Sequence, residues 1–517
     1  MTKKNRKPGR AEHRRNPRGI NPILAMSEVS VSALHSHYPT RLFDTDRSYF
    51  RFALDLLRIL GQHNTIETHG LTYEPVLLPR ASQGRERLSR HAPPELQGLD
   101  LAAMGLVLVD GEIIQNYLPM SHFDTGPVRA AFGKTTLVDP FYGIAFFEAD
   151  GRWREFAFAV DDLFRQTENN PALRDVLFRS PGDVLDTGLS IGRAMLKDLL
   201  PTDARDAQAR HEIPEVRIGS LKELHKWAAD LKALKAQYPK LGVWFRGQPC
   251  EFLTPDRSLA VARGAMGHAR FRDASLVPSV YRNFRDHYAN KTTFSRFLDS
   301  LFVWHDAARP LIGPSYEIVP LGAPPSRPAL GEHAEFSVHT YAPDGTGGAG
   351  EGHTKHYHRQ ADFLRHGLLL QHYGCPTPFL DVTSSVDVAH WFATHVPGGD
   401  TLFQPSPWSG SGPCIYVFLA AEDVLPVYDS AVIDDERKSL RAHRQECGLI
   451  GGSGLLVQNF PARYIALKLR LDEGLGPAKA LSEEELFPGP EDDPMLAALL
   501  DSERLRQERL FPIYGRF

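Results

Sequence analysis

A strict alternation near the C-terminus constrains the fold most strongly. Four large apolar residues, Ile465, Leu467, Leu469 and Leu471, alternate with Ala466, Lys468 and Arg470. This period of two predicts a half-buried antiparallel strand. An apolar run over residues 414–419 predicts a second strand, and residues 494–509 predict a closing helix. The C-terminal part is therefore expected to be an α+β unit of mainly antiparallel strands with flanking helices.

Two Asp-Gly pairs predict hairpins in the N-terminal part. Asp110-Gly111 would join residues 106–109 to 112–114, and Asp150-Gly151 would join residues 144–147 to 153–160. A helix is expected over residues 48–60. This part is therefore predicted to be a separate α+β unit, and its residues indicate no chemistry.

The first twenty residues hold eight Lys and Arg residues against Glu12, a net charge of +7 (8 − 1), whereas the whole chain carries −4. Such an arm is predicted to be disordered, and contact with nucleic acid is the alternative interpretation. The arm lacks the apolar region of a secretory signal, and no stretch is apolar enough to cross a membrane. The four cysteines form no Cys-x-x-Cys pair, which argues against a zinc ribbon and favours a cytoplasmic protein.

A domain boundary is expected near residues 201–214, which lack large apolar residues at any regular period. The Ser220-Leu221-Lys222-Glu223 segment then has the form of a capping box and opens a helix whose apolar residues, beginning with Leu221, recur at helical spacing. The predicted organisation is a disordered basic arm over residues 1–20, an N-terminal α+β domain over 21–205, and a C-terminal domain over 216–517.

Three histidines, His353, His356 and His358, follow a glycine-rich stretch at residues 345–352. The stretch predicts a flexible surface loop, since no strand leads into it. His353 and His356 would share one face of a helix, but a solvated histidine-rich loop is the favoured interpretation. No metal site is predicted.

Two segments are the best candidates for a functional site. Arg246 leaves an apolar strand beside Gly247, with its guanidinium fork available for an anion. A predicted helix begins at Thr383 and Ser384, where side-chain hydroxyls and backbone amides could also bind an anion. Structural interpretations stand beside these: Arg246 pairs with Asp381 of a neighbouring strand, and Thr383 or Ser384 is only the N-cap of the helix.

The motifs of this C-terminal part resemble those of the FRG domain, which is named for Phe-Arg-Gly. They are residues 244–248 (Trp-Phe-Arg-Gly-Gln), 276–282, 371–383 and 389–393, with Leu486-Phe487-Pro488 as the closing motif. The chain departs from the family at Pro378 and Val382, where arginine and tryptophan are usual, and its Gln445-Glu446-Cys447-Gly448 segment matches the late family motif loosely. The resemblance implies the fold of residues 216–517 and no reaction.

The chain also has an aromatic-Arg-Gly strand at residues 245–247, a strand-to-helix junction rich in serine and threonine that is followed by Ala-x-x-Phe-Ala at 389–393, and a later glutamate. These motifs resemble those of ADP-ribosyltransferases, and this second resemblance implies a reaction. In that family an arginine holds the phosphate and ribose side of NAD, serine or threonine hydroxyls organise the nicotinamide ribose pocket, and a glutamate supports the cationic sugar. The resemblance implies Arg246, Thr383 and Glu446 as catalytic residues and NAD as substrate. The remaining candidates for binding NAD are Gln248, Gln371, His372, Tyr373, Ser384 and Trp391, of which Tyr373 or Trp391 would stack on nicotinamide.

Two functions follow from these residues. The first is an enzyme that transfers ADP-ribose to a macromolecule or hydrolyses NAD, as a toxin or defence effector would. The second is a non-catalytic module that senses a nucleotide or binds a partner with the same pocket.

Overall fold

We describe a computed structural model of the 517-residue chain. Within the N-terminal part the structure describes residues 67–68, 71–72, 88–92, 94–99, 101, 106–109, 136–139, 144–149 and 152–157. Further along it describes residues 196, 198–209, 213–237, 241–252, 274–279, 291–313, 316–320, 336–340, 353–357, 367, 369–377, 379–398, 403–406, 408, 411–421, 427–429, 438–450, 459, 461–462, 465–478, 480–509 and 511–514. The predicted basic arm, the helix at 48–60 and the glycine-rich stretch at 345–352 lie outside these residues.

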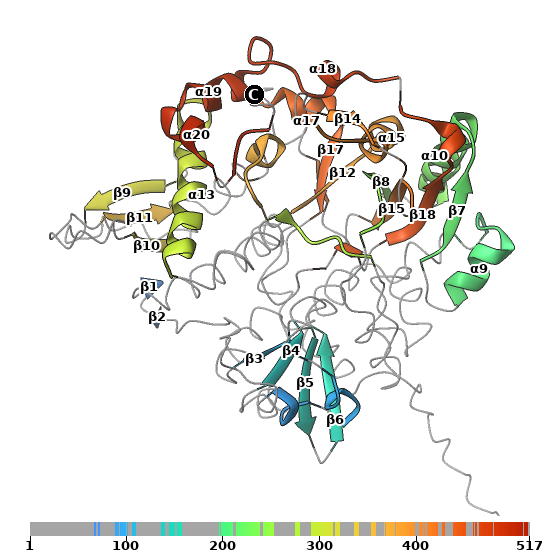
Figure 1. The fold of residues 1–517 in the computed structure, drawn as a ribbon, viewed down its shortest axis with the longest axis horizontal. Helices are drawn as coiled ribbons and strands as arrows, with labels where there is room; N and C mark the ends of the chain where they lie inside the picture. The colour runs from blue at the N-terminus through green and yellow to red at the C-terminus, as the bar shows by residue number, and fades with distance from the viewer. Residues whose placement is uncertain are drawn as a thin grey trace, which may run out of the picture.

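A seven-stranded sheet organises the C-terminal part (Figure 1). Its strands, in spatial order, are β16 (Val427–Asp429), β17 (Cys447–Ile450), β12 (Leu380–Thr383), β8 (Leu241–Gln248), β15 (Cys414–Ala421), β18 (Ile465–Leu471) and β7 (Glu215–Ile218). Neighbouring strands are antiparallel except β18 and β7, which are parallel. The prediction of an α+β fold with a mainly antiparallel sheet is therefore confirmed.

Two helices connect directly to this sheet. Helix α10 (Leu221–Gln237) precedes β8 and buries Leu224, Ala228, Leu231 and Leu234, whereas Leu221 is 44% exposed and does not belong to the apolar stripe. Its start differs from a full capping box: the Ser220 hydroxyl accepts from the Glu223 amide, but the Glu223 carboxylate accepts from the amide of Gly219. Helix α15 (Val386–Thr394) follows β12 and lies against β8 at Gly247.

The C-terminal helices pack against a long helix, α13 (Lys291–Ile312). The predicted single helix over 494–509 is two helices, α19 (Pro494–Asp501) and α20 (Glu503–Gln507). Ser502 separates them because its backbone is extended (φ −73°, ψ 109°) and its side chain caps the Leu505 amide. Shorter elements are α9 (Thr202–Ala209), within the predicted boundary segment, α17 (Leu440–Arg444), α18 (Glu483–Leu486), η1 (Pro94–Leu96), η4 (Gln371–Tyr373) and η6 (Glu473–Leu475).

The N-terminal part contains a four-stranded antiparallel sheet of β3 (Val107–Val109), β4 (Thr136–Asp139), β5 (Ile144–Ala149) and β6 (Arg152–Ala157), and a pair of short strands, β1 (Glu67–Thr68) and β2 (Leu71–Thr72). The hairpin predicted at Asp150-Gly151 is confirmed, because Ala149 pairs with Arg152. The hairpin predicted at Asp110-Gly111 involves residues 110–114, which lie outside the described residues; its first strand, β3, pairs with β4 on one edge.

The histidine-rich segment is a strand and not a loop or helix. Strand β11 (His353–Tyr357) lies between β10 (Phe336–Thr340) and β9 (Tyr316–Pro320) in a three-stranded sheet. His353 and His356 both lie in this strand, and His358 lies outside the described residues. A further two-stranded sheet is formed by β13 (His395–Pro397) and β14 (Phe403–Pro405).

Strand β18 was predicted to be half-buried, but it is buried on both faces because an ion-pair network covers its polar side. Lys468 is only 8% exposed, and its ammonium lies 2.7 Å from Glu215 and 2.9 Å from Glu251. Arg470 reaches the same two carboxylates at 3.1 and 2.8 Å. Two cations and two anions therefore connect β18 to β7 and to the residues that follow β8.

This network is expected to make folding sensitive to acid. Burial alone would raise the pKa of Glu215 and of Glu251, but the bonds from Arg470 and Lys468 outweigh it and lower both. A lowered folded-state pKa gives stability that is present above the unfolded value, 4.5, and is lost as the pH falls through the folded value. Urea unfolding at pH 7 and below pH 4.5 should show this loss, and it should be smaller in Glu251→Gln. If the variant lost as much stability in acid as the wild type does, the ion-pair network would not be the cause of the acid sensitivity.

Among the described residues, none of the helices is long and apolar enough to cross a membrane.

Candidate functional site

The two candidate segments lie next to each other at the centre of the sheet. Thr383, the last residue of β12, pairs with Phe245 of β8 on one side and with Cys447 of β17 on the other. Directly paired residues of an antiparallel sheet project to the same face. Phe245, Thr383 and Cys447 therefore face α15, whose backbone lies against Gly247 of β8.

Arg246 leaves the opposite face of the sheet, because it follows Phe245 in the strand. Its Nη1 donates to the backbone carbonyl of Asp381 at 2.5 Å. β8 and β12 share only the Thr383–Phe245 pair, so this bond holds the two strands together where their ladder has ended. The expected contact between Arg246 and Asp381 exists, through the main chain of Asp381. The side chains of Arg246 and Thr383 do not start on one face.

The buried Gln371 and the half-buried Asp381 of β12 form a hydrogen-bonded polar group. The Gln371 amide nitrogen donates to Asp381 Oδ1 at 2.6 Å and to the Phe379 carbonyl at 3.3 Å, while its oxygen accepts from the Thr377 hydroxyl. The Thr377 amide in turn donates to the Ser279 hydroxyl at 3.2 Å. Ser279 of the 276–282 motif therefore lies beside this polar group. Both ends of the Gln371 carboxamide are therefore used inside the protein.

His372 lies close to Asp381 and Cys447. One potential ligand atom from each of the three residues lies within 4.8 Å of the others, and His372 and Cys447 are buried. Burial lowers the pKa of His372, and the nearby Asp381 charge opposes this only in part. The structure thus collects an imidazole, a carboxylate and a thiol from η4, β12 and β17.

Tyr373 anchors a second buried network and is fully buried. Its hydroxyl donates to Asp493 at 2.7 Å and lies 3.2 Å from the Ser439 hydroxyl, and the Arg441 guanidinium lies 4.8 Å from its ring centroid. Gly374 ends η4 with a φ of 117°, in the left-handed region that favours glycine, and its amide donates to the Gln371 carbonyl. Tyr373 therefore belongs to the core of the domain and has its ring covered by Arg441.

The start of α15 brings Thr383, Ser384 and Glu446 together. The N-cap is Ser385, one residue beyond the predicted Thr383 or Ser384, because the Ser385 hydroxyl accepts from the Val388 amide. Thr383 donates to the Gln445 carbonyl at 2.7 Å. Ser384 binds Glu446 twice, through its amide to the carbonyl at 3.0 Å and through its hydroxyl to Oε2 at 2.9 Å.

Glu446 itself has an unusual backbone. Its φ of 44° is the only positive φ of a non-glycine residue among the residues that the structure describes. It is exposed, and it occupies the tight turn between α17 and β17. A glutamate in the left-handed region costs about 1–2 kcal/mol relative to ordinary backbone, which glycine would avoid. This backbone position and the Ser384 hydroxyl together orient the carboxylate.

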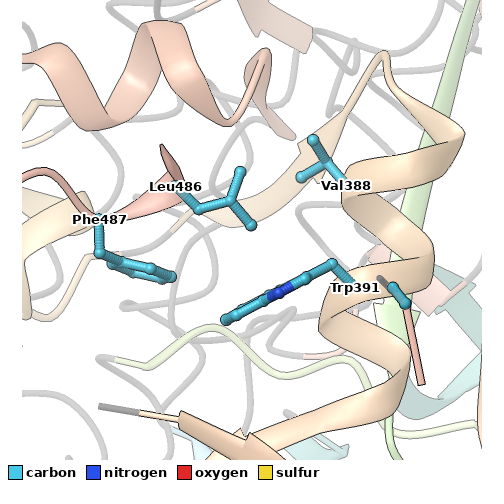
Figure 2. Close-up of a cluster of buried hydrophobic side chains, with 5 residues drawn as sticks. Val388, Trp391, Leu486 and Phe487 are labelled. Carbon is cyan, nitrogen blue, oxygen red and sulfur yellow. The ribbon is translucent and has the colours of Figure 1, made fainter. Parts of the chain in front are cut away.

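Trp391 is 2% exposed and lies in the apolar cluster between α15 and the segment that follows α18. Figure 2 shows Val388 and Trp391 projecting from α15 toward Leu486 and Phe487 of the closing motif. The Trp391 ring stacks on His395 at 4.4 Å between centroids. Its ring is thus occupied by protein contacts, and its evident role is to hold the closing motif on α15.

Gln248 ends β8 opposite Cys414 and is 6% exposed. Within the described part of the chain its Oε1 has no hydrogen-bond partner. Near the start of α15, Asp387 lies in the first turn and its carboxylate accepts from His225 Nε2 at 2.7 Å. A carboxylate at this helix start opposes the binding of a second anion there.

The residue patterns did not reveal three members of these networks. Asp493 directly before Pro494 is a local signal of a helix start, which residue patterns alone could have shown, whereas Arg441 has no local signal because a single buried charge looks like any surface charge in the sequence. Cys447 was noted only within a loose family motif. Its proximity to His372 and Asp381 depends on strand pairing between segments that are far apart in the chain.

Comparison with protein-family models matches residues 350–399 to the FRG domain. The matched segment holds η4, β12 and α15, and so includes the polar group of Gln371 and Asp381 and the start of α15. Comparison with curated proteins and with solved structures gives no match. The family match concerns the domain and not a reaction, and the resemblance to ADP-ribosyltransferases stays a prediction. The chain therefore contains an FRG domain in its C-terminal part.

Proposed function

We propose that the FRG domain uses NAD, either transferring ADP-ribose to a macromolecule or hydrolysing NAD, with Glu446 as the catalytic carboxylate. The observation that carries this proposal is the exposed Glu446 side chain, oriented by a left-handed backbone and by the Ser384 hydroxyl at 2.9 Å. Unfavourable backbone conformations that persist often mark functional sites. A purely structural turn at this place would be served better by glycine.

The chemistry requires a carboxylate of this kind. Cleavage of the bond between C1′ of the ribose and nicotinamide leaves the electron pair on nicotinamide and develops positive charge on the sugar. Glu446 would stabilise that charge near the 2′-hydroxyl. Water or a macromolecular nucleophile then bonds to C1′ and releases its proton to Glu446 or to solvent. Ser384 acts through Glu446 and is a positioning residue.

The other candidate residues have supporting roles in this proposal. Thr383 holds the Glu446 turn through the Gln445 carbonyl, and Arg246 fixes β12 beneath it. Gln371 binds Asp381 of β12, and Trp391 holds the closing motif on α15, whereas Tyr373 belongs to the network around Asp493. Contact of Arg246 with the pyrophosphate of NAD would require its bond to Asp381 to break.

The test measures release of nicotinamide from NAD by the purified full-length chain, with and without cell extract as acceptor. Glu446→Gln is expected to lower the rate by about 100-fold or more, a loss typical of removing one electrostatic contact to a transition state. Glu446→Gly should lower it equally while relieving the backbone and leaving the protein at least as stable. Glu473→Gln, an exposed glutamate in η6, is the matched control and should keep wild-type activity.

If the protein acts as a toxin or defence effector, its effect on cells should depend on Glu446. Expression of the wild-type chain should lower cellular NAD and growth, and Glu446→Gln should not. Wild-type protein that is folded, binds NAD and releases no nicotinamide with any extract would contradict the enzymatic proposal.

That last result would support the second candidate function, a module that binds a nucleotide or partner without reaction. The observation that favours it is the internal use of the anion-binding candidates: Arg246 bonds to Asp381, and the Gln371 carboxamide is bonded at both ends. Calorimetric titration with NAD and ADP-ribose distinguishes the two, because a sensor binds the ligand and leaves it intact.

A further inference from the structure

We propose that His372, Asp381 and Cys447 bind a divalent transition-metal ion of the Zn²⁺ class. Their ligand atoms all lie within 4.8 Å of one another, and the three residues come from η4, β12 and β17. The sequence offered no metal-ligand spacing here, so the site exists only through the pairing of these elements. The proposal is independent of NAD chemistry.

The backbone explains why the three side chains meet. Cys447 pairs directly with Thr383, and Asp381 is two residues before Thr383, so Asp381 and Cys447 project from the same face of adjacent strands as diagonal neighbours. The preceding η4 is attached to β12 by Gln371, whose amide nitrogen bonds to Asp381 Oδ1 at 2.6 Å and to the Phe379 carbonyl. This attachment brings His372 to the same place.

A second observation points to a ligand. His372 is only 6% exposed, and its Nε2 has no hydrogen-bond partner within the described part of the chain. Buried polar atoms are almost always satisfied, and one without a protein partner calls for an ion or a water molecule. A metal ion held by the imidazole together with Asp381 and Cys447 supplies that missing interaction.

The donor set selects the metal. Thiolate, imidazole and carboxylate are the ligands of Zn²⁺ and its neighbours, whereas Mg²⁺ and Ca²⁺ prefer oxygen alone. Three protein ligands leave one position of a tetrahedral ion for water or another small ligand. Gln371 provides the outer contact that commonly orients a ligating carboxylate, because it donates to Asp381.

The experiment uses the full-length chain after removal of metal with a chelator. Addition of Co²⁺ should produce the intense visible bands of a tetrahedral ion and a near-ultraviolet band from thiolate to cobalt, and Zn²⁺ should abolish both at about one equivalent. Cys447→Ser should remove the thiolate band. Cys414→Ser, which changes another buried cysteine in β15, is the matched control and should retain it.

Asp381→Asn tests the site with little change in shape, since an asparagine oxygen can still accept from Gln371. We expect it to weaken Zn²⁺ binding at least about tenfold. Zinc should also raise the thermal midpoint of the wild-type chain, a measurement that needs no variant. Wild-type protein without the cobalt bands, or a thiolate band that persists in Cys447→Ser, would overturn the proposal.

Discussion

Gly247→Val is expected to prevent stable folding of the C-terminal sheet. A Cβ atom at position 247 would lie 1.8 Å from the Ala389 carbonyl oxygen and 2.6 Å from the Ala393 amide nitrogen. Both atoms belong to the backbone of α15, so no side-chain rotation relieves the overlap. The helix would have to leave β8, which would open the apolar cluster around Trp391. We expect a loss of more than about 4 kcal/mol in the free energy of unfolding.

The measurement is chemical unfolding of the purified chain followed by circular dichroism, with soluble yield as a first indicator. Gly247→Ala should already have most of the effect, because the overlap is with Cβ itself. Gly474→Ala is the matched control, since nothing lies within 4 Å of its Cβ position, and it should unfold like the wild type. A wild-type midpoint for Gly247→Ala would show that α15 does not lie on β8 as described.

Asp493→Ala is expected to have the second-largest effect. Asp493 is fully buried, accepts the Tyr373 hydroxyl at 2.7 Å and caps α19 through the Met495 and Leu496 amides. Its charge also acts on Arg441, which is 1% exposed and whose pKa is lowered by burial. Removal of the carboxylate would leave the buried Tyr373 hydroxyl and the first amides of α19 without their acceptor, and it would remove a negative charge that favours the charged form of Arg441. Leaving a buried donor without its partner costs about 1–3 kcal/mol for each group.

A graded series separates the contributions to this loss. Tyr373→Phe removes one hydrogen bond and should cost about 1 kcal/mol. Ser502→Ala removes only the cap of α20 and should cost about the same. The double variant Asp493→Ala with Arg441→Leu should be more stable than Asp493→Ala alone, because the unpaired cation is gone. If urea midpoints of Asp493→Ala and Tyr373→Phe coincide, the charge contribution is absent.

The local elements of the fold could be predicted from residue patterns. The strand that contains Arg246, the strands β15 and β18, and the hairpin of β5 and β6 all follow from neighbouring residues. The histidine-rich segment was predicted wrongly, because it is strand β11 and lies between two strands from other parts of the chain.

In the candidate site, too, local residue patterns predicted the elements, and contacts with distant segments decided the details. The segment of Thr383 and Ser384 was identified correctly as a strand-to-helix junction, yet the N-cap is Ser385, since the Thr383 hydroxyl is taken by the Gln445 carbonyl from another part of the chain. Arg246 and Thr383 were both candidates for one anion site. Strand alternation and the Thr383–Phe245 pair put the two on opposite faces.

The sequence by itself determined the strands, the turns and the motifs of the FRG domain, because periodicity and turn chemistry act between residues that are close in the chain. Only the tertiary structure decided which charges meet. The left-handed Glu446 beside Ser384, the His372, Asp381 and Cys447 cluster, and the Tyr373 network with Asp493 each join segments that are far apart. Their contacts depend on strand order and register, which no local pattern encodes.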